Sequence, residues 1–242
     1  MALLAALTQA LGRVGLHIVR PVSQDALDRE GVAFRLESLL PGARTALVIG
    51  DGGPDFFAGF SVARAASPDA DTDPLERYTV AVVSGAVASV VAGEAHRLRF
   101  PFGHDADLPI QSLGRAAGIP PGGPLGLQIH PAFGPWWAYR ALLVVRETIA
   151  PLPPLAGSCP GCPAPCVSVC PAGAPTAAGF RVNVCAAERD RSVVCGEACG
   201  ARSACVVGGE HRYPAGQLAF HMRASLAMIR SYRASTSPPA RG

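Results

Sequence analysis

The chain has 242 residues, of which 49% are hydrophobic, a mean hydropathy of +0.27 and a formal net charge of +3. This composition excludes disorder over most of the chain. A chain of this length is long enough for one hydrophobic core and a smaller module. The basic residues are all arginine, which excludes lysine chemistry such as a Schiff base, and they are too scattered to predict a nucleic-acid partner.

Hydrophobic periodicity and short apolar runs predict the secondary structure. Leu3, Leu7 and Leu11 follow one helical face, and the continuous apolar run over 45–50 is typical of a strand buried on both faces. Strands that alternate with helices predict a three-layer α/β domain. In chain order we expect a helix over 3–14, a strand over 16–22, a helix beginning at Ser23, a strand over 45–50, a helix over 74–92, a strand over 96–102, a helix over 108–118, and strands over 125–130 and 141–147.

A proline-rich segment that begins at Pro151 separates a cysteine-free part of the chain from a cysteine-rich part. We therefore expect an α/β domain over 1–150 and a small α+β module over 151–210. A closing helix and a Ser/Pro-rich disordered tail are expected over 211–242.

No membrane-spanning segment is expected. The longest apolar stretch, 78–93, is shorter than the ~20 residues that a spanning helix needs. The first ten residues show neither the basic start nor the cleavage site of a secretory signal. We therefore expect a cytoplasmic protein without a membrane partner.

All eight cysteines lie in one stretch that begins 158 residues into the chain. Eight thiolates are the number that two four-iron clusters need, and the Cys-x3-Cys-Pro sequence at 166–171 repeats the end of the bacterial ferredoxin motif. The stretch predicts a ferredoxin-like module with two [4Fe-4S] clusters, and therefore electron transfer. The cysteines are Cys159, Cys162, Cys166, Cys170, Cys185, Cys195, Cys199 and Cys205.

Two other uses of the cysteines remain open. A disulfide framework needs an oxidising compartment, which the expected location does not supply. A zinc site usually shows paired Cys-x2-Cys knuckles, and Cys159-x2-Cys162 is one such pair. The dense spacing and the Cys-Pro ending favour clusters over both alternatives.

The bacterial arrangement also predicts which cysteines share a cluster, because the fourth cysteine of a run ligates the other cluster. One set is then Cys159, Cys162, Cys166 and Cys205. The other set is Cys170, Cys185, Cys195 and Cys199. The second spacing of the run is three residues rather than two, and Cys205 is not followed by proline. A single cluster therefore remains an alternative to two.

One segment before the cysteines carries a resemblance to a known family. The sequence at 130–136, His-Pro-Ala-Phe-Gly-Pro-Trp, resembles the His-Pro-x-Phe-Gly-x-Trp segment of cobalamin-processing proteins of the CblC type. The cysteine module, in the order four, one, three, resembles epoxyqueuosine reductase, a cobalamin-dependent enzyme with two four-iron clusters. The two resemblances cover roughly residues 40–215. Both imply a nitroreductase-like domain that binds a corrinoid.

The chain also departs from epoxyqueuosine reductase. We expect no counterpart of that enzyme's C-terminal helical-repeat region within the 242 residues, and the loop over 118–124 lacks its Gly-rich signature. Fold and cofactor class therefore carry over better than substrate does. We expect an oxidoreductase of this type that takes electrons from a donor protein (a ferredoxin, a flavodoxin or a reductase) and passes them to a corrinoid.

The resemblance also implies roles for individual residues, each with a plainer alternative. His130, Phe133 and Gly134 would lie at the corrinoid face, although His130 is equally consistent with a hydrogen-bonding core residue. Of Trp136 and Trp137, one would stack on the macrocycle while the other is core.

Charged residues complete the expected site. Arg140 would bind an anion or a corrinoid side chain, and its alternative is a surface ion pair. A catalytic acid would fall near Asp105 or Asp107. Their alternative role is to cap the helix that follows.

Overall fold

The computed structural model describes residues 2–66, 73–105 and 107–236. The contacts of the chain divide it into two units. Unit 1 is Met1–Pro121 with Trp136–Ala156, and unit 2 is Gly122–Pro135 with Gly157–Gly242. The segment 122–135, expected in the α/β domain, thus belongs with the cysteines.

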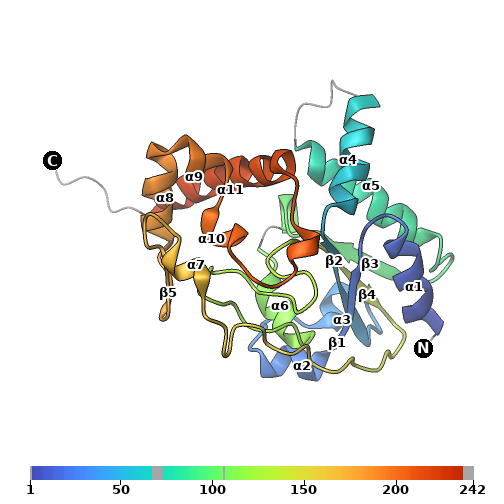
Figure 1. Ribbon diagram of the computed structural model, residues 1–242. Helices are drawn as coiled ribbons and strands as arrows, with labels where there is room; N and C mark the ends of the chain where they lie inside the picture. Colours follow the sequence, from blue (N-terminus) through green and yellow to red (C-terminus); the bar gives the residue numbers. More distant parts are fainter. Residues whose placement is uncertain (1, 67–72, 106, 237–242) are drawn as a thin grey trace. The chain divides into compact units, whose positions relative to one another are not determined.

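Unit 1 is a four-stranded antiparallel sheet in the order β1-β2-β4-β3 between two layers of helices (Figure 1). Its elements are α1 (Ala2–Gly12), β1 (Ile18–Ser23), α2 (Gln24–Arg29), α3 (Leu36–Leu39), β2 (Thr45–Gly52), α4 (Asp55–Ala66), α5 (Pro74–Ala88), β3 (His96–Arg99), η1 (Gly103–Asp105), α6 (Ile110–Ala116) and β4 (Trp137–Val145).

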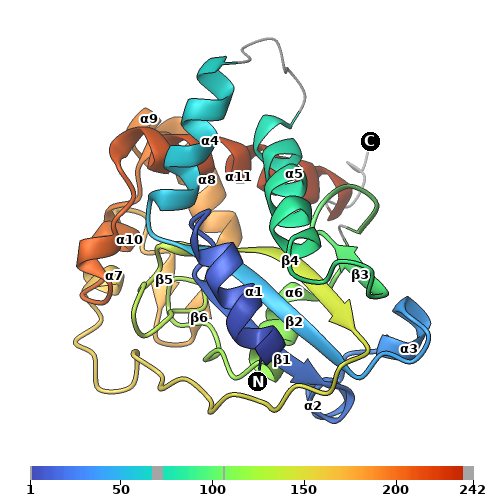
Figure 2. The same ribbon diagram turned by 90° about the vertical axis from the view of Figure 1, so that its right-hand side faces the viewer.

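The two central strands are buried on both faces because alternate residues serve different layers. Leu47 and Ile49 of β2 pack with residues of α1, α4 and α5. Ala46 and Val48 pack with residues of α2, α3 and α6. Figure 2 looks onto the sheet with α1 and α5 in front of it. The predicted three-layer α/β class is confirmed.

Unit 2 is built from short elements and one long helix. Helices α8, α9 and α11 contact one another and lie side by side in Figure 1. The elements are α7 (Pro165–Ser168), β5 (Pro175–Thr176), β6 (Gly179–Phe180), α8 (Val182–Arg191), α9 (Val193–Glu197), α10 (Gly200–Ser203), η2 (Gly209–His211) and α11 (Ala215–Thr236). Most of the expected tail lies outside the described residues. No helix in the described part of the chain is long and apolar enough to cross a bilayer.

The strand expected over 125–130 is wrong. The segment forms only isolated bridges, Gly122 with Gln128 and His130 with Gly134. Its apolar side chains Leu125 and Ile129 are buried among the cysteines rather than in a sheet. A short apolar run predicts that its side chains are buried, and here these buried side chains belong to a loop rather than to a strand. Helix α4 was not expected, although Phe56 and Phe60 carry its buried face.

Arg20 anchors the proline-rich segment to unit 1. The guanidinium of this buried residue donates to the carbonyl oxygens of Ala117 at 2.6 Å and Pro153 at 2.5 Å. Beside it, the amide of Leu155 donates to the carbonyl of Gly118 at 2.8 Å. The proline-rich segment is therefore part of the folded unit rather than a loose linker.

We expect Arg20→Met to lower the free energy of unfolding by about 1.5–3 kcal/mol, because two carbonyl groups lose a charged donor. Hydrogen exchange of the Leu155 amide should also become faster. Arg146→Met is the matched control, since the exposed Arg146 donates to the carbonyl of Pro41 at 2.8 Å. Equal effects of the two substitutions would contradict the anchoring role.

Candidate functional site

The cysteines of unit 2 line an apolar core of their own. Cys166 is buried with Leu125, Ile129 and Ala201, and other thiols pack around this group. All eight cysteines are free thiols, so nothing in the structure supports a disulfide framework. Side chains from 122–135 and from the cysteine stretch therefore enclose the sulfur atoms together.

The electrostatic neighbours of the thiols divide them into two groups of four. The pKa of Cys159 is raised by burial and then by the nearby Cys205, Cys162 and Cys166. Burial, Cys205 and Cys162 likewise raise the pKa of Cys166. These four thiols are named group A.

The remaining thiols surround Cys185, whose pKa is raised above all by burial. The charge of Arg189 lowers the pKa of Cys185, whereas the neighbouring Cys199, Cys170 and Cys195 raise it. These four thiols are named group B. Groups A and B are the two sets that the ferredoxin spacing predicts.

Short helices and backbone amides position the thiols. Ala164, at a left-handed φ of 51°, turns the chain into α7, and its amide donates to Sγ of Cys162 at 3.4 Å. Cys199 is the N-cap of α10, and its Sγ accepts from the amide of Arg202 at 3.4 Å. Hydrogen bonds of this kind stabilise thiolates and tune the potential of a bound cluster.

The fit to iron–sulfur clusters rests on spacing and on close packing. A zinc ion holds its sulfur ligands at about 2.3 Å, and therefore within about 4 Å of one another. In the described part of the chain, no three or more His, Cys, Asp or Glu side chains are arranged to hold a metal ion. The case for clusters therefore rests on the number and the grouping of the thiols. A Cβ on Gly123 would lie 2.5 Å from Sγ of Cys159, so a side chain at this position would crowd or displace that thiol of group A.

The predicted corrinoid residues at 130–134 form a tight turn in unit 2. The backbones of His130 and Gly134 exchange hydrogen bonds of 2.9 and 2.7 Å. Nδ1 of the buried His130 accepts from the amides of Ala132 and Phe133 at 3.2 and 3.3 Å. The proton of a neutral ring then resides on Nε2. This turn gives His130 the hydrogen-bonding role named above as its alternative.

The turn packs against the chain just after the last cysteine. Gly134 has a φ of +58°, and a Cβ there would lie 2.0 Å from the carbonyl oxygen of Val207. Gly208 has a φ of +66°, and its Cβ would lie 2.3 Å from the carbonyl carbon of Phe133. The ring of Phe133 also lies 4.7 Å from that of His211. Both glycines are therefore required by the backbone contact.

The two tryptophans are both buried in unit 1. Trp136 is 1% exposed and Trp137 is 8% exposed. Trp137 meets the ring of Tyr139 edge to face at 4.5 Å. Neither indole presents an exposed face to a macrocycle.

Arg140 forms a buried ion pair that sequence reasoning missed. Its Nε and a terminal nitrogen donate to the two carboxylate oxygens of Asp51 at 3.1 and 3.0 Å. Asp51 is fully buried, and its carboxylate also accepts from the amide of Ala138 at 3.0 Å. The guanidinium lies 4.9 Å from the ring centre of Phe56. The alternative expected for Arg140 was a surface ion pair. This is wrong, because its partner Asp51 is a buried core residue.

The two acids expected near the reaction centre lie beside β3 and α6. The carboxylate of Asp105 pairs with Nε of Arg99 at 2.5 Å and accepts from the amide of Phe100 at 3.2 Å. Asp107 is exposed. Neither caps α6, whose N-cap is Pro109, so the capping alternative is wrong.

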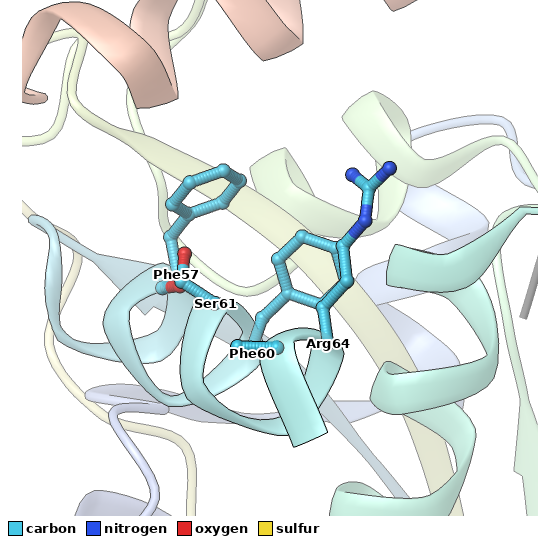
Figure 3. A pocket seen from close by; sticks show the side chains of 5 residues that line it. Phe57, Phe60, Ser61 and Arg64 are labelled. Atoms are coloured by element: carbon cyan, nitrogen blue, oxygen red, sulfur yellow. The ribbon is translucent and has the colours of Figure 1, made fainter. Parts of the chain in front are cut away.

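An open hollow of about 410 Å³ lies on α4. Figure 3 shows that the side chains of Phe57 and Arg64 project from α4 at this pocket. Phe60, Ser61 and Ala65 complete its lining. None of the residues predicted from the sequence contributes to it.

The raised thiol pKa values predict how stability of the metal-free chain depends on pH. Unfolded thiols ionise near pH 8.5, whereas burial keeps Cys159, Cys166 and Cys185 protonated to higher pH. Above that pH the unfolded chain binds fewer protons than the folded chain, so stability falls. We expect the urea midpoint of metal-free protein to drop between about pH 8 and pH 10. A triple Cys→Ser variant at these positions should show a flatter profile, and an equal slope would contradict the prediction.

Comparisons with known proteins identify the architecture. No protein-family model and no curated protein matches the chain. Solved structures do match, and they share the nitroreductase-like fold that the sequence resemblance implies. Because their identities are all low, the likeness shows fold alone.

The B12-trafficking protein CblC of C. elegans, described as a human MMACHC homologue, matches at 15% identity with a TM-score of 0.57, over 96% of this chain and 95% of its own. Epoxyqueuosine reductase with a tRNA-Tyr stem loop matches at 14% identity with a TM-score of 0.56, over 89% and 68%. A selenomethionine-labelled epoxyqueuosine reductase matches at 14% identity with a TM-score of 0.50, over 89% and 70%.

Proposed function

We propose that the chain is an iron–sulfur redox protein, with one [4Fe-4S] cluster held by group A and one by group B. The observation that carries this proposal is the division of eight free thiols into two groups of four. Each group has the number of thiolates that one four-iron cluster binds. Such clusters would supply single-electron transfer.

The residues around the thiols have definite tasks in this proposal. Leu125, Ile129 and Ala201 keep water from sulfur atoms of both groups. The amides of Ala164 and Arg202 donate to thiolates and thereby favour their ionised state. Gly123 leaves room beside Cys159.

We further propose that the electrons pass to a corrinoid or a related substrate on unit 1, taken from a donor protein. The fold likeness to a B12-trafficking protein and to epoxyqueuosine reductase supports this acceptor class. The residues first expected to hold it fit poorly: Trp136 is buried, and Arg140 is neutralised by Asp51. The corrinoid would therefore depend on other groups, and we derive no chemical step through it.

A second candidate is a ferredoxin-like carrier that passes electrons to a partner protein without a corrinoid of its own. The specific observation in its favour is that the expected anion-binding residue and one of the two expected acids are already paired. Arg140 is held by Asp51, and Asp105 by Arg99. Under this proposal unit 1 would serve for docking.

Anaerobic purification followed by analysis of iron, sulfide, zinc and cobalt tests these proposals together. About eight irons per chain and a spectral change on adding cobalamin would support the corrinoid-linked reductase. Eight irons without a cobalamin response would favour the carrier, and about four would leave one cluster. Zinc without iron would overturn the redox function, because zinc has no redox step.

A further inference from the structure

Arg189 is a buried cation beside group B. It lies on α8 four residues after Cys185, so the two side chains project from the same face of the helix. The residue is 7% exposed. Burying a charge is costly unless it is paired and hydrogen-bonded, so this position calls for a specific partner.

The guanidinium is held in place from α11. One terminal nitrogen donates to the carbonyl of Met222 and, at 3.1 Å, to Oγ of Ser225. Ser225 in turn donates to the same carbonyl at 3.0 Å. These partners are neutral, so they fix the position of the charge without cancelling it.

The Nε of Arg189 is buried and has no hydrogen-bond partner within the described residues. The acids nearest in sequence are otherwise engaged: Glu188 pairs with Arg191, and Asp190 pairs with Arg230. A buried N–H without a partner is costly. A cluster sulfur at group B would provide the missing acceptor.

We propose that Arg189 is the positioning residue that sets the reduction potential of the group B cluster above that of the group A cluster. The inference rests on the proposed iron–sulfur function. Reduction adds one electron to a cluster and thus one negative charge, which a fixed nearby cation stabilises. An electron from a one-electron donor then resides first at group B.

The surroundings of the two groups differ in the way the proposal requires. The charge of Arg189 acts on Cys185, where it opposes the effect of burial on the thiol pKa. At Cys159 the shift comes from burial and from other thiols. The apolar side chains of Leu125, Ile129 and Ala201 pack against thiols of both groups, so the buried cation is the feature that distinguishes group B. The group beside the 130–134 turn is therefore the stronger reductant.

The test is a redox titration with dithionite, followed by electron paramagnetic resonance, on the full chain reconstituted with iron and sulfide. We expect Arg189→Gln to shift the equilibrium constant for electron transfer between the two clusters about tenfold in favour of reduced group A. This corresponds to a change of about 59 mV in the difference between the two reduction potentials, for a one-electron couple. Arg189→Lys should stay near wild type because it keeps the charge. Arg191→Gln, on the exposed side of α8, is the matched control.

Unchanged potentials in Arg189→Gln, or an equal shift of both clusters, would overturn the inference while leaving the iron–sulfur function intact. A wild-type chain without iron would instead overturn the proposed function itself. Should Arg189→Gln fail to fold, the wild type still decides the question. Cys166→Ser removes a ligand of group A and so assigns the two signals, and a higher potential at group A would refute the proposal.

Discussion

Replacement of Asp51 by asparagine is expected to lower the free energy of unfolding by about 3–5 kcal/mol. The asparagine can still accept from the amide of Ala138, but it leaves the charge of Arg140 buried without its counter-charge. A buried charge that loses its partner costs far more than an exposed one. Urea unfolding followed by circular dichroism measures the change.

The control for this prediction is Asp55→Asn. Asp55 is 68% exposed in its side chain and pairs with His17 at 3.2 Å, so its loss should cost at most about 1 kcal/mol. The double variant Asp51→Leu with Arg140→Met should recover most of the stability, because apolar side chains can replace a buried pair. If Asp51→Asn were as mild as Asp55→Asn, the buried pair would not stabilise the sheet as described.

Under the proposed iron–sulfur function, replacement of Gly134 by alanine is expected to remove the group A cluster and to halve the iron content, from about eight to about four per chain. The new Cβ would lie 2.0 Å from the carbonyl oxygen of Val207, and this backbone cannot move aside as a side chain would. Val207 follows Cys205 by two residues, so its displacement moves a thiol of group A. Iron analysis of the reconstituted chain measures the loss.

Gly31→Ala separates crowding from backbone strain. Gly31 also has a positive φ, +67°, but nothing lies within 4 Å of the added Cβ. Its substitution should cost about 1–2 kcal/mol and leave the iron content unchanged. Full iron in Gly134→Ala, or equal loss from both groups, would show that the 130–134 turn does not support group A.

What the sequence predicts well is what depends on nearby residues. The apolar runs over 45–50 and 141–147 became the two central strands because a strand buried on both faces needs apolar residues at every position. The electrostatic neighbours of Cys159 and Cys185 fall into the sets that the bacterial ferredoxin arrangement predicts, in which the fourth cysteine of a run joins the other set. Ser23 caps α2 through its hydroxyl, which accepts from the amide of Ala26.

What the sequence does not reveal depends on distant partners. Nothing near Asp51 in the chain indicates that it pairs with Arg140, because the contact exists only once β2 lies against β4. The same limit explains the error over 125–130. An apolar run indicates that its side chains are buried, but it does not indicate in which unit they are buried. Leu125 and Ile129 pack against cysteines from the later part of the chain.

The chain passes from one unit to the other at three places: after Pro121, after Pro135 and after Ala156. The cysteine unit is therefore not an appendage that begins where the α/β unit ends. A fragment starting at Gly157 would lack Leu125, Ile129 and the turn that supports Val207. Gene fusion at that boundary would therefore transfer an incomplete cysteine unit to another protein. The part before it would carry residues 122–135 without the rest of unit 2, so neither half of the chain contains one complete unit and nothing more.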